Sequence, residues 1–295
     1  MQPTPSQSTE FFDAGDFAGE EVRDMKVTGI HSDRVVVVTG ASTGIGRGVA
    51  TTFAKAGASV LVHGLTAAQV AETVEAITAM GGSARGVHGD VAEEETHQRI
   101  IAAAMGEFGR IDHLVASAGI QTYGDSLITS VEEFDRIYAV NVRGVFLAVQ
   151  ASIPEIRKNH GTVCIISSVQ GVATQRNVVG YTTTKGALNA MSRAMAVDEA
   201  EHAVRVNVVL PGSIDTPMLR ASAHQWSDGT DVGAQKVVED WGRSHPLGRV
   251  GMPEEVGEVC SFLASTSASF VTGAEIRVDG GLLAQIGAAL PSKLD

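Results

Sequence analysis

A run of four valines that ends in a glycine-rich turn constrains the fold of this chain more than any other feature. The run is Val35–Val38, it continues as Thr-Gly-Ala-Ser-Thr-Gly-Ile-Gly, and a helical pattern begins near Ile45. In such a strand–turn–helix unit, Gly40 permits the tight turn, Gly44 lets the backbone approach a pyrophosphate, and Gly46 lets the helix pack closely on the strand. The helix N-terminus supplies free N–H donors and a positive dipole. We therefore predict a dinucleotide-binding turn.

The chain beyond this turn alternates strand-like and helical patterns. Several strands are nearly continuous Val, Ile and Leu, which indicates burial on both faces and hence a parallel sheet covered by helices. The predicted strands are Arg34–Thr39, Ser59–His63, Ala84–His88, His113–Ala116, Thr162–Ser167, Val204–Val209 and Glu275–Val278. Amphipathic helices include Ala67–Met80, Glu93–Phe108, Phe134–Ile156 and Tyr181–Glu201. This alternation predicts an α/β fold: a single-domain, doubly wound Rossmann-type fold with a seven-stranded parallel sheet and helices on both faces.

The two ends of the chain fall outside this pattern. Residues 1–30 mix proline, glycine and acidic residues without a regular period, so we predict a mobile N-terminal extension. The dinucleotide-binding catalytic domain is predicted over 31–283, and 284–295 form a C-terminal extension. The apolar residues Leu282, Leu283, Ile286 and Leu290 suggest that this end covers a neighbouring subunit.

Composition excludes several classes of function. A formal net charge of −12 argues against binding to nucleic acid or to an anionic membrane. The cysteines Cys164 and Cys260 form no CxxC, and the histidines show no HxH or HExxH spacing, so we predict neither a metal site nor a disulfide framework. No run of 18 or more apolar residues occurs. The first thirty residues include several acidic ones, whereas a secretory signal needs an apolar stretch there. We expect a cytoplasmic protein.

A second motif joins three candidate catalytic residues. Tyr181 and Lys185 open an amphipathic helix at i, i+4 spacing, which places the phenol and the ammonium on one face. Ser168 stands thirteen residues before Tyr181, directly after a predicted strand. With the Thr-Gly-xxx-Gly-x-Gly spacing of the turn, this arrangement resembles the short-chain dehydrogenase/reductase family over about residues 33–283. The resemblance implies that Ser168, Tyr181 and Lys185 act together, and that Asn141, in Asn-Val-Arg-Gly, is a fourth catalytic residue that holds a proton-relaying water.

Elementary electrostatics gives each of these residues a role. A free phenol has a pKa of about 10, so at neutral pH it is a poor base for an alcohol proton. One positive charge at ~4 Å is worth about 4 kcal/mol at an effective dielectric of ~20, or roughly three pKa units. We therefore expect Lys185 to bring the pKa of Tyr181 near neutrality, and an oxidised nicotinamide ring, itself positive, to lower that pKa further. The Ser168 hydroxyl can orient and polarise the substrate oxygen.

Other segments after strand ends also resemble the family. Gly89-Asp90-Val91 is similar to its adenine-contacting element, and Pro211–Thr216 to the loop that receives the nicotinamide carboxamide. Where the family usually shows Asn-Asn-Ala-Gly, this chain has Ala116-Ser117-Ala118-Gly119, so a shorter hydroxyl replaces an amide at Ser117. The cofactor-binding residues implied are Gly40, Ser42, Thr43, Gly44, Ile45, Gly46, Leu65, Asp90, Val91, Ser117, Ala118, Gly119, Tyr181, Lys185, Pro211, Gly212, Ile214 and Thr216.

The choice between NAD(H) and NADP(H) stays open. Residues at the end of the second strand usually decide it, through a carboxylate for the NAD ribose or a cation for the NADP phosphate. Here the run is Val-His-Gly-Leu-Thr over 62–66, and it supplies neither. Thr43 is also neutral, at a position where NADP-preferring relatives often carry a basic residue.

The expected partner is a small alcohol or carbonyl substrate. Met218–His245 is interpreted as a substrate lid or as a helical pair that packs for stability. Gln170, Gln175 and Tyr123 follow strand ends and are candidate contacts at the rim of the site. Family members are commonly tetramers, so we expect a homotetramer.

The leading functional hypothesis is reversible carbonyl/alcohol interconversion. The substrate is either a 3-oxoacyl thioester, or a sugar or small secondary alcohol, and the sequence does not separate these. A non-catalytic nucleotide-sensing protein is the alternative class. Such a protein has no need to retain Ser168, Tyr181 and Lys185 together.

Overall fold

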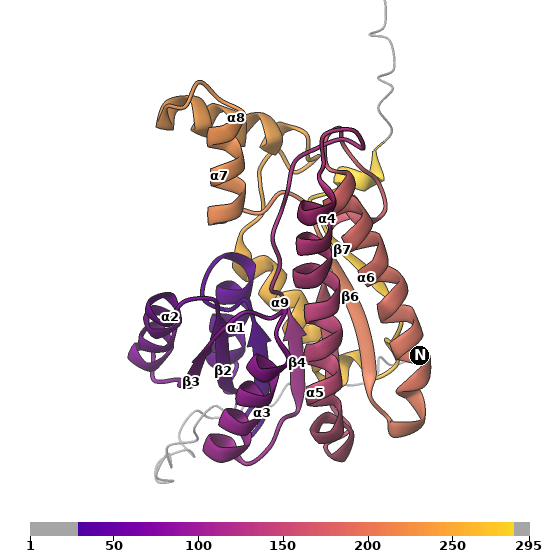
Figure 1. The fold of residues 1–295 in the computed structure, drawn as a ribbon. Coiled ribbons are helices and arrows are strands. Elements are labelled where there is room, and N and C mark those ends of the chain that lie inside the picture. Colours follow the sequence, from indigo (N-terminus) through magenta and orange to yellow (C-terminus); the bar gives the residue numbers. More distant parts are fainter. Residues whose placement is uncertain (1–28, 286–295) are drawn as a thin grey trace, which may run out of the picture.

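A seven-stranded parallel sheet forms the centre of the molecule (Figure 1). The computed structural model describes residues 29–285. The strands are β1 (Val35–Thr39), β2 (Ser59–Gly64), β3 (Ser83–His88), β4 (His113–Ala116), β5 (Thr162–Ile166), β6 (Arg205–Pro211) and β7 (Glu275–Val278). Their order is β3-β2-β1-β4-β5-β6-β7, and every neighbouring pair is parallel. The strand order reverses between β1 and β4, so the predicted doubly wound sheet is confirmed.

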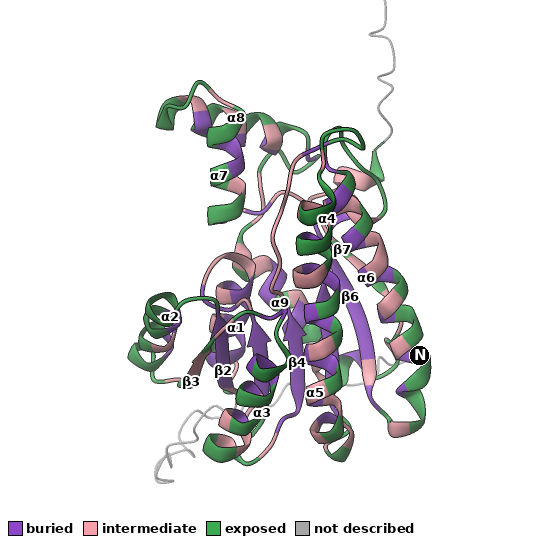
Figure 2. Cartoon of the chain, in the orientation of Figure 1, coloured by how far each residue is buried: buried purple, intermediate pink, exposed green. Residues whose placement is uncertain are grey.

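Helices cover both faces of this sheet. They are α1 (Gly44–Lys55), α2 (Ala67–Ala79), α3 (Glu94–Phe108), α4 (Val131–Tyr138), α5 (Gly144–Lys158), α6 (Val179–Asp198), α7 (Pro217–Gln225), α8 (Asp231–Arg243) and α9 (Pro253–Ala264). Val36 and Val38 pack in a cluster with α1 and α9, whereas Val37 packs in a second cluster with α3 and α5. Successive strand side chains point to opposite faces, so a strand covered on both sides needs an unbroken apolar run. Figure 2 shows the buried strands beneath helices whose outer surfaces are exposed.

The helix predicted over 134–156 is longer and contains an irregular turn. A π-helical turn, Ala139–Arg143, joins α4 to α5, so helical residues run from Val131 to Lys158. Such turns are frequent at functional sites, and this one carries Asn141. One 18-residue window of the segment is apolar enough to cross a membrane by length and composition, with 44% of it buried in the domain. Its apolar face packs against α3 and β4 in the core.

Smaller differences concern element boundaries. β1 begins at Val35 instead of Arg34, and β6 begins at Arg205 and continues to Pro211. The extensions predicted at 1–30 and 284–295 lie almost entirely outside the described residues, as do Ile286 and Leu290. Whether they are mobile or cover a neighbour stays a prediction.

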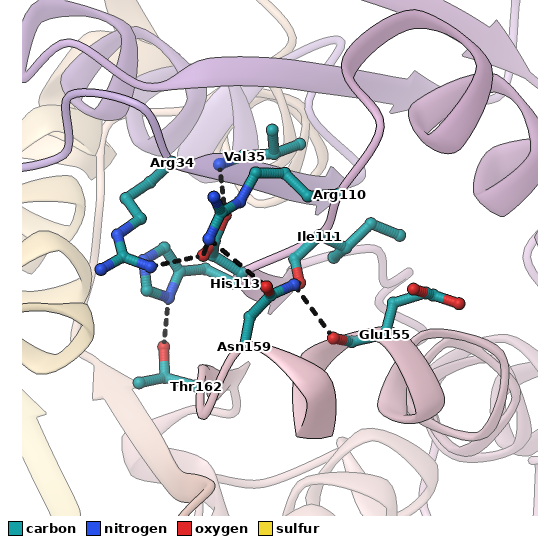
Figure 3. A network of polar contacts seen from close by, with 9 residues as sticks. Arg34, Val35, Arg110, Ile111, His113, Glu155, Asn159 and Thr162 are labelled. Carbon is teal, nitrogen blue, oxygen red and sulfur yellow. Dashed lines mark hydrogen bonds and ion pairs between the residues drawn. The ribbon is translucent and has the colours of Figure 1, made fainter.

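A buried carboxylate joins the amino ends of β1 and β4 through contacts with Arg34, Val35 and Arg110, which Figure 3 labels. Asp112, 0% exposed, accepts hydrogen bonds from Arg34 at 2.8 Å, from Arg110 at 2.7 and 2.8 Å, and from the Val35 N–H at 2.9 Å. Burial alone would raise the pKa of Asp112, but these donors outweigh it and hold that pKa below its usual value. The network therefore links the amino ends of these strands, at the end of the sheet opposite the candidate site.

The helices α7 and α8 form an arm above the carboxyl edge of the sheet, at the top of Figure 1. Ala223, Ala234 and Val238 pack between them as a small cluster of their own. Much of the outer surface of the arm is exposed (Figure 2). Most residues of the segment Met218–His245 belong to these two helices. The segment is therefore a helical pair, and it lies beside the carboxyl ends of the strands, where ligands bind in such sheets.

Candidate active site

The turn between β1 and α1 has the backbone of a phosphate-binding site. Gly40 and Gly44 have φ values of +67° and +53°, in the left-handed region that favours glycine. A Cβ on Gly46 would lie 2.1 Å from Gly40 O, so this close packing of helix on turn requires glycine. Thr43 precedes α1, and its side chain makes no capping hydrogen bond. The N–H groups of the first turn of α1 therefore remain available to an anion.

A cavity of about 350 Å³ opens at this turn. The predicted residues that line it are Gly40, Ser42, Thr43, Gly44, Ile45, Gly46, Leu65, Asp90, Val91, Ser117, Ala118, Gly119, Tyr181, Lys185 and Thr216. The other predicted cofactor residues, Pro211, Gly212 and Ile214, line an adjoining cavity instead. The glycine turn and the uncapped helix start fit the pyrophosphate of a nicotinamide dinucleotide.

His63 is a cavity residue that the sequence motifs do not single out. Its Nδ1 accepts from the Gly40 N–H at 3.4 Å, and its Nε2 donates to Gly89 O at 3.0 Å. Both ring nitrogens of the neutral imidazole are thus used, and burial lowers the pKa of His63 to about 4. The side chain ties the phosphate turn to the segment that carries Asp90. The one sequence feature that could have indicated this role is the position of His63 near the carboxyl end of β2.

Three side chains on helical segments are among the other unpredicted residues that line this cavity, called the cofactor cavity below. Gln69 comes from α2, Arg136 from α4, and Val140 from the π-helical turn. Arg136 and Val140 lie four residues apart on one continuous helical segment, so they share a face. Which face points into the site depends on the packing of that segment, and the local pattern does not reveal it.

Ser168, Tyr181 and Lys185 converge at the carboxyl end of β5. Lys185 Nζ lies 5.4 Å from the centroid of the Tyr181 ring and donates to the backbone oxygen of Ile166 at 3.0 Å. Ser168 follows β5 by two residues, and its Oγ accepts from the Gln170 N–H at 3.1 Å. Tyr181 lines both cavities, Lys185 the cofactor cavity, and Ser168 the adjoining one. The structure therefore brings these three predicted residues together.

The electrostatics of this group differ from the expectation. Burial raises the pKa of Tyr181 to about 12, although a hydrogen bond with the Ser168 hydroxyl opposes the shift. Burial also lowers the pKa of Lys185 to about 8. The prediction of a Tyr181 pKa near neutrality is therefore wrong for the protein without coenzyme. The cost of desolvating the phenolate exceeds the stabilisation that neighbouring groups give it.

Asn141 is fully buried in the π-helical turn. Its Oδ1 accepts from the Ile120 N–H at 2.8 Å, and its Nδ2 donates to Ile120 O at 2.9 Å and to Thr184 Oγ1 at 3.1 Å. The amide thereby fixes the chain that follows β4, including Gly119, against α6. A Cβ on Gly119 would come within 3.3 Å of Asn141 Oδ1 and 3.8 Å of Lys185 Nζ. These contacts make Asn141 a positioning residue, and its role in holding a water stays a prediction.

The adjoining cavity, also about 350 Å³, is the candidate substrate site. It contains Ser168 and Tyr181 together with Gln170, Gln175 and Tyr123, the three predicted rim residues. From the arm come Met218, Leu219, Ser222 and Trp241. Within the described part of the chain, 29–285, the residues that line this cavity include no Lys, Arg, His, Asp or Glu. The cavity therefore offers amides, hydroxyls and apolar surface to a substrate.

Tyr123 fastens the arm across this cavity. Its hydroxyl donates to Ser222 Oγ at 2.6 Å, and its ring meets that of Trp226 edge to face at a centroid distance of 5.5 Å. Trp226 does not itself line the cavity, although it lies in the predicted lid segment. The loop after β4 and the helix α7 are thus joined above the site.

Comparisons with known proteins agree with this architecture. A family model described as Enoyl-(Acyl carrier protein) reductase matches residues 40–283. The chain is 35% identical to L-rhamnose 1-dehydrogenase (NAD(P)(+)) of Sphingomonas over 84% of this chain and 96% of that protein. It is 37% identical to cyclopentanol dehydrogenase of Comamonas over 86% and 98%. The solved structure of Thermoplasma acidophilum aldohexose dehydrogenase superposes with a TM-score of 0.82 at 34% identity, covering 88% of this chain and 98% of that one. The chain therefore belongs to the short-chain dehydrogenase/reductase family of NAD(P)-dependent oxidoreductases.

Proposed function

We propose that this protein interconverts a secondary alcohol and a carbonyl compound, with Tyr181 as the acid/base. The observation that carries the proposal is that Tyr181 lines both cavities, with the Lys185 ammonium near its ring and the Ser168 hydroxyl within hydrogen-bonding reach. A substrate oxygen held by Tyr181 and Ser168 lies at the border between the cofactor cavity and the substrate cavity.

Each residue has a defined task in this proposal. A bound nicotinamide dinucleotide supplies or accepts the hydride. The Ser168 hydroxyl donates to the substrate oxygen, while the Gln170 N–H occupies one of its lone pairs. Tyr181 gives its proton to the oxygen during carbonyl reduction and takes it back during alcohol oxidation. Lys185, held by the backbone oxygen of Ile166, stabilises negative charge on the phenol.

The substrate is a neutral sugar or small secondary alcohol in our proposal. The uncharged lining of the substrate cavity supports this choice, because a phosphate or carboxylate buried there would have no counter-charge. The similarity to proteins named rhamnose, aldohexose and cyclopentanol dehydrogenase points in the same direction. A 3-oxoacyl thioester, the other substrate left open by the sequence, carries phosphates on its carrier group, and this lining offers those phosphates no counter-charge.

Both NAD and NADP are accepted as coenzymes in our proposal. A Cβ on Gly64 would lie 2.4 Å from Ser42 Cβ, so this position has no room for a discriminating side chain. The next residue, Leu65, is 65% exposed and uncharged. With neither a carboxylate nor a cation at the end of β2, the ribose 2′-substituent meets little attraction or repulsion there.

A homotetramer is proposed for the assembly. Exposed apolar side chains occur on the α4–α5 segment at Val131 and Phe146, and elsewhere at Phe262 of α9 and at Phe270. Protein–protein contacts are a common way to cover large apolar side chains that a single chain leaves exposed. Light scattering coupled to size-exclusion chromatography measures the mass, and a monomer would refute the proposal.

A coenzyme-reduction screen tests the proposed function. Wild-type protein is mixed with NAD or NADP and with panels of aldoses, cyclic alcohols and 3-hydroxyacyl thioesters. We expect turnover in the first two panels, and a loss of about 10²- to 10⁴-fold in Tyr181→Phe with coenzyme affinity retained. Full activity of Tyr181→Phe, or turnover confined to thioesters, would contradict the proposal. Tyr138→Phe, which removes an exposed phenol from α4, is the matched control.

A further inference from the structure

Gln170 carries a buried acceptor that no residue of the described chain satisfies. Its Oε1 is inaccessible to solvent and has no hydrogen-bond partner within residues 29–285. The residue lies in a short 3₁₀ turn, Val169–Gly171, and lines the substrate cavity. An unpaired buried acceptor costs free energy on the order of 1–3 kcal/mol, so folded proteins keep few of them. This one belongs to a residue that lines the substrate cavity, where a ligand could supply the missing partner.

Two other unpaired atoms provide a contrast with Gln170. Asn189 Oδ1 and Ser192 Oγ are also buried without a partner in the described part of the chain, but both belong to α6 and neither lines the substrate cavity. A ligand in the substrate cavity therefore cannot offset the free-energy cost of leaving these two atoms unpaired. Gln170 differs because its side chain lines the substrate cavity, so that rotation of the amide can turn either polar end toward a substrate.

The turn also fixes the distance between Gln170 and the reacting oxygen. The backbone N–H of Gln170 donates to Ser168 Oγ at 3.1 Å, so the residue that polarises the substrate oxygen and the residue with the free amide share one turn. A substrate oxygen bound by Ser168 therefore lies one short turn away from the Gln170 side chain, in the cavity that both residues line. The amide can present its carbonyl oxygen or its NH₂ group, so it matches a hydroxyl, which both donates and accepts.

We propose that Gln170 binds a second hydroxyl of the substrate, on a carbon next to the reacting one, and thereby selects neutral polyhydroxylated substrates over simple alcohols. The proposal rests on the function proposed above and names the substrate class of that same site. A site built to pair with a hydroxyl rejects an analogue that lacks it, because the buried polar group is then left unpaired.

A cycle of residue and substrate deletions tests this proposal. Wild type and Gln170→Met are compared on aldopyranoses (glucose, mannose, galactose and rhamnose), on their 2-deoxy analogues, and on cyclopentanol. Methionine keeps the length of the side chain and the backbone N–H to Ser168 but forms no comparable hydrogen bond. On the best aldopyranose we expect Gln170→Met to lower kcat/KM by about 10- to 100-fold, mainly through KM. On the analogue without the hydroxyl and on cyclopentanol, the change should stay within about 3-fold.

The thermal midpoint of Gln170→Met provides a second test, because loss of a merely structural residue would lower the midpoint. Removing an unpaired buried amide should leave the thermal midpoint of the ligand-free protein unchanged or raise it by about 2–4 °C. Gln98→Met, on the exposed side of α3, is the matched control and should behave as wild type. An equal loss on every substrate together with a lower midpoint would overturn the proposal, as would unchanged selectivity.

Direct binding separates this proposal from the function it rests on. Calorimetric titration of aldopyranose into the coenzyme-saturated protein needs no turnover. If wild type reduces no coenzyme yet binds the sugar, and Gln170→Met does not, the proposed function fails and the role of Gln170 stands. If wild type turns over cyclopentanol but neither turns over nor binds any aldopyranose, the proposed function stands and the role of Gln170 fails.

Discussion

The ammonium group of Lys185 lies 5.4 Å from the centroid of the Tyr181 ring, and its hydrogen bond goes to the backbone oxygen of Ile166. The pKa of Tyr181 is raised by burial to about 12, so the phenol is protonated at every pH below that value. Burial lowers the pKa of Lys185 to about 8, so this side chain loses part of its charge in mildly alkaline solution. The protein alone therefore holds Tyr181, the proposed acid/base residue, in the proton-donating form.

The first prediction concerns the titration of this phenol. The chain contains three tyrosines, Tyr123, Tyr138 and Tyr181. The ultraviolet difference between wild type and Tyr181→Phe should reveal a phenol with a pKa of about 12 in the free protein. Oxidised coenzyme carries a positive ring and should lower this pKa, because opposite charge favours the phenolate. A Tyr181 pKa near 7 without coenzyme would contradict the burial argument.

A second prediction concerns coenzyme choice at Leu65. This side chain is exposed at the end of β2 beside the cofactor cavity, whereas Gly64 has no room for a substituent. Leu65→Arg should favour NADP over NAD by about 5- to 10-fold relative to wild type, since one charge-assisted contact with a phosphate is worth roughly 1 kcal/mol at an exposed site. Leu65→Asp should shift the ratio the other way.

Dissociation constants measured by fluorescence quenching with each reduced coenzyme check this prediction. Wild type should bind the two with similar affinity, and raising the salt concentration should weaken the Leu65→Arg gain for NADP. A strong wild-type preference would show that a contact elsewhere in the site decides.

The third prediction concerns the contact that fastens the arm. Tyr123→Phe removes the 2.6 Å hydrogen bond to Ser222 but keeps the ring against Trp226. We expect a rise in KM of about 3- to 10-fold, because one neutral hydrogen bond contributes about 1 kcal/mol. Amide hydrogen exchange in α7 should accelerate. Unchanged exchange in α7, with Tyr138→Phe as control, would mean that the arm is held by its other contacts.

A fourth prediction concerns the contribution of Asp112, at the amino ends of β1 and β4, to the stability of the protein. Asp112→Asn should lower the free energy of unfolding by about 2–4 kcal/mol at pH 7, since Arg34 and Arg110 lose their buried counter-charge. The folded-state pKa of Asp112 is depressed, so its contribution is fully present above the unfolded-state value of about 3.9 and is lost as the pH falls through the folded-state value.

Denaturant titrations at several pH values measure this effect. The difference between wild type and Asp112→Asn should shrink below about pH 4. Glu107→Gln, at an exposed position of α3, is the control and should change stability little. A difference that stays constant down to pH 2 would rule out the charged network as its source.

The local sequence is sufficient to predict the framework of the fold, the phosphate-binding turn and the pairing of Tyr181 with Lys185, whereas the family resemblance supplied most of the other residues predicted to line the cofactor cavity. The valine run of β1, the spacing of Gly40, Gly44 and Gly46, and the i, i+4 pair of Tyr181 and Lys185 are short-range patterns. Their physical consequences are burial on both faces, a tight turn and a shared helix face. Each consequence depends on neighbours within one element, so the amino-acid sequence by itself determines it.

The features that depend on distant segments are decided by the tertiary structure alone. The pKa of Tyr181 follows from the burial of the whole site, so an expectation based on one nearby charge has the wrong direction. His63 gains its role from Gly40 and Gly89, and Asn141 from Ile120, through contacts that join separate strands and helices. The unpaired amide of Gln170 results from the placement of every neighbour around it. Desolvation and hydrogen-bond satisfaction are properties of the packed molecule, and no local pattern encodes them.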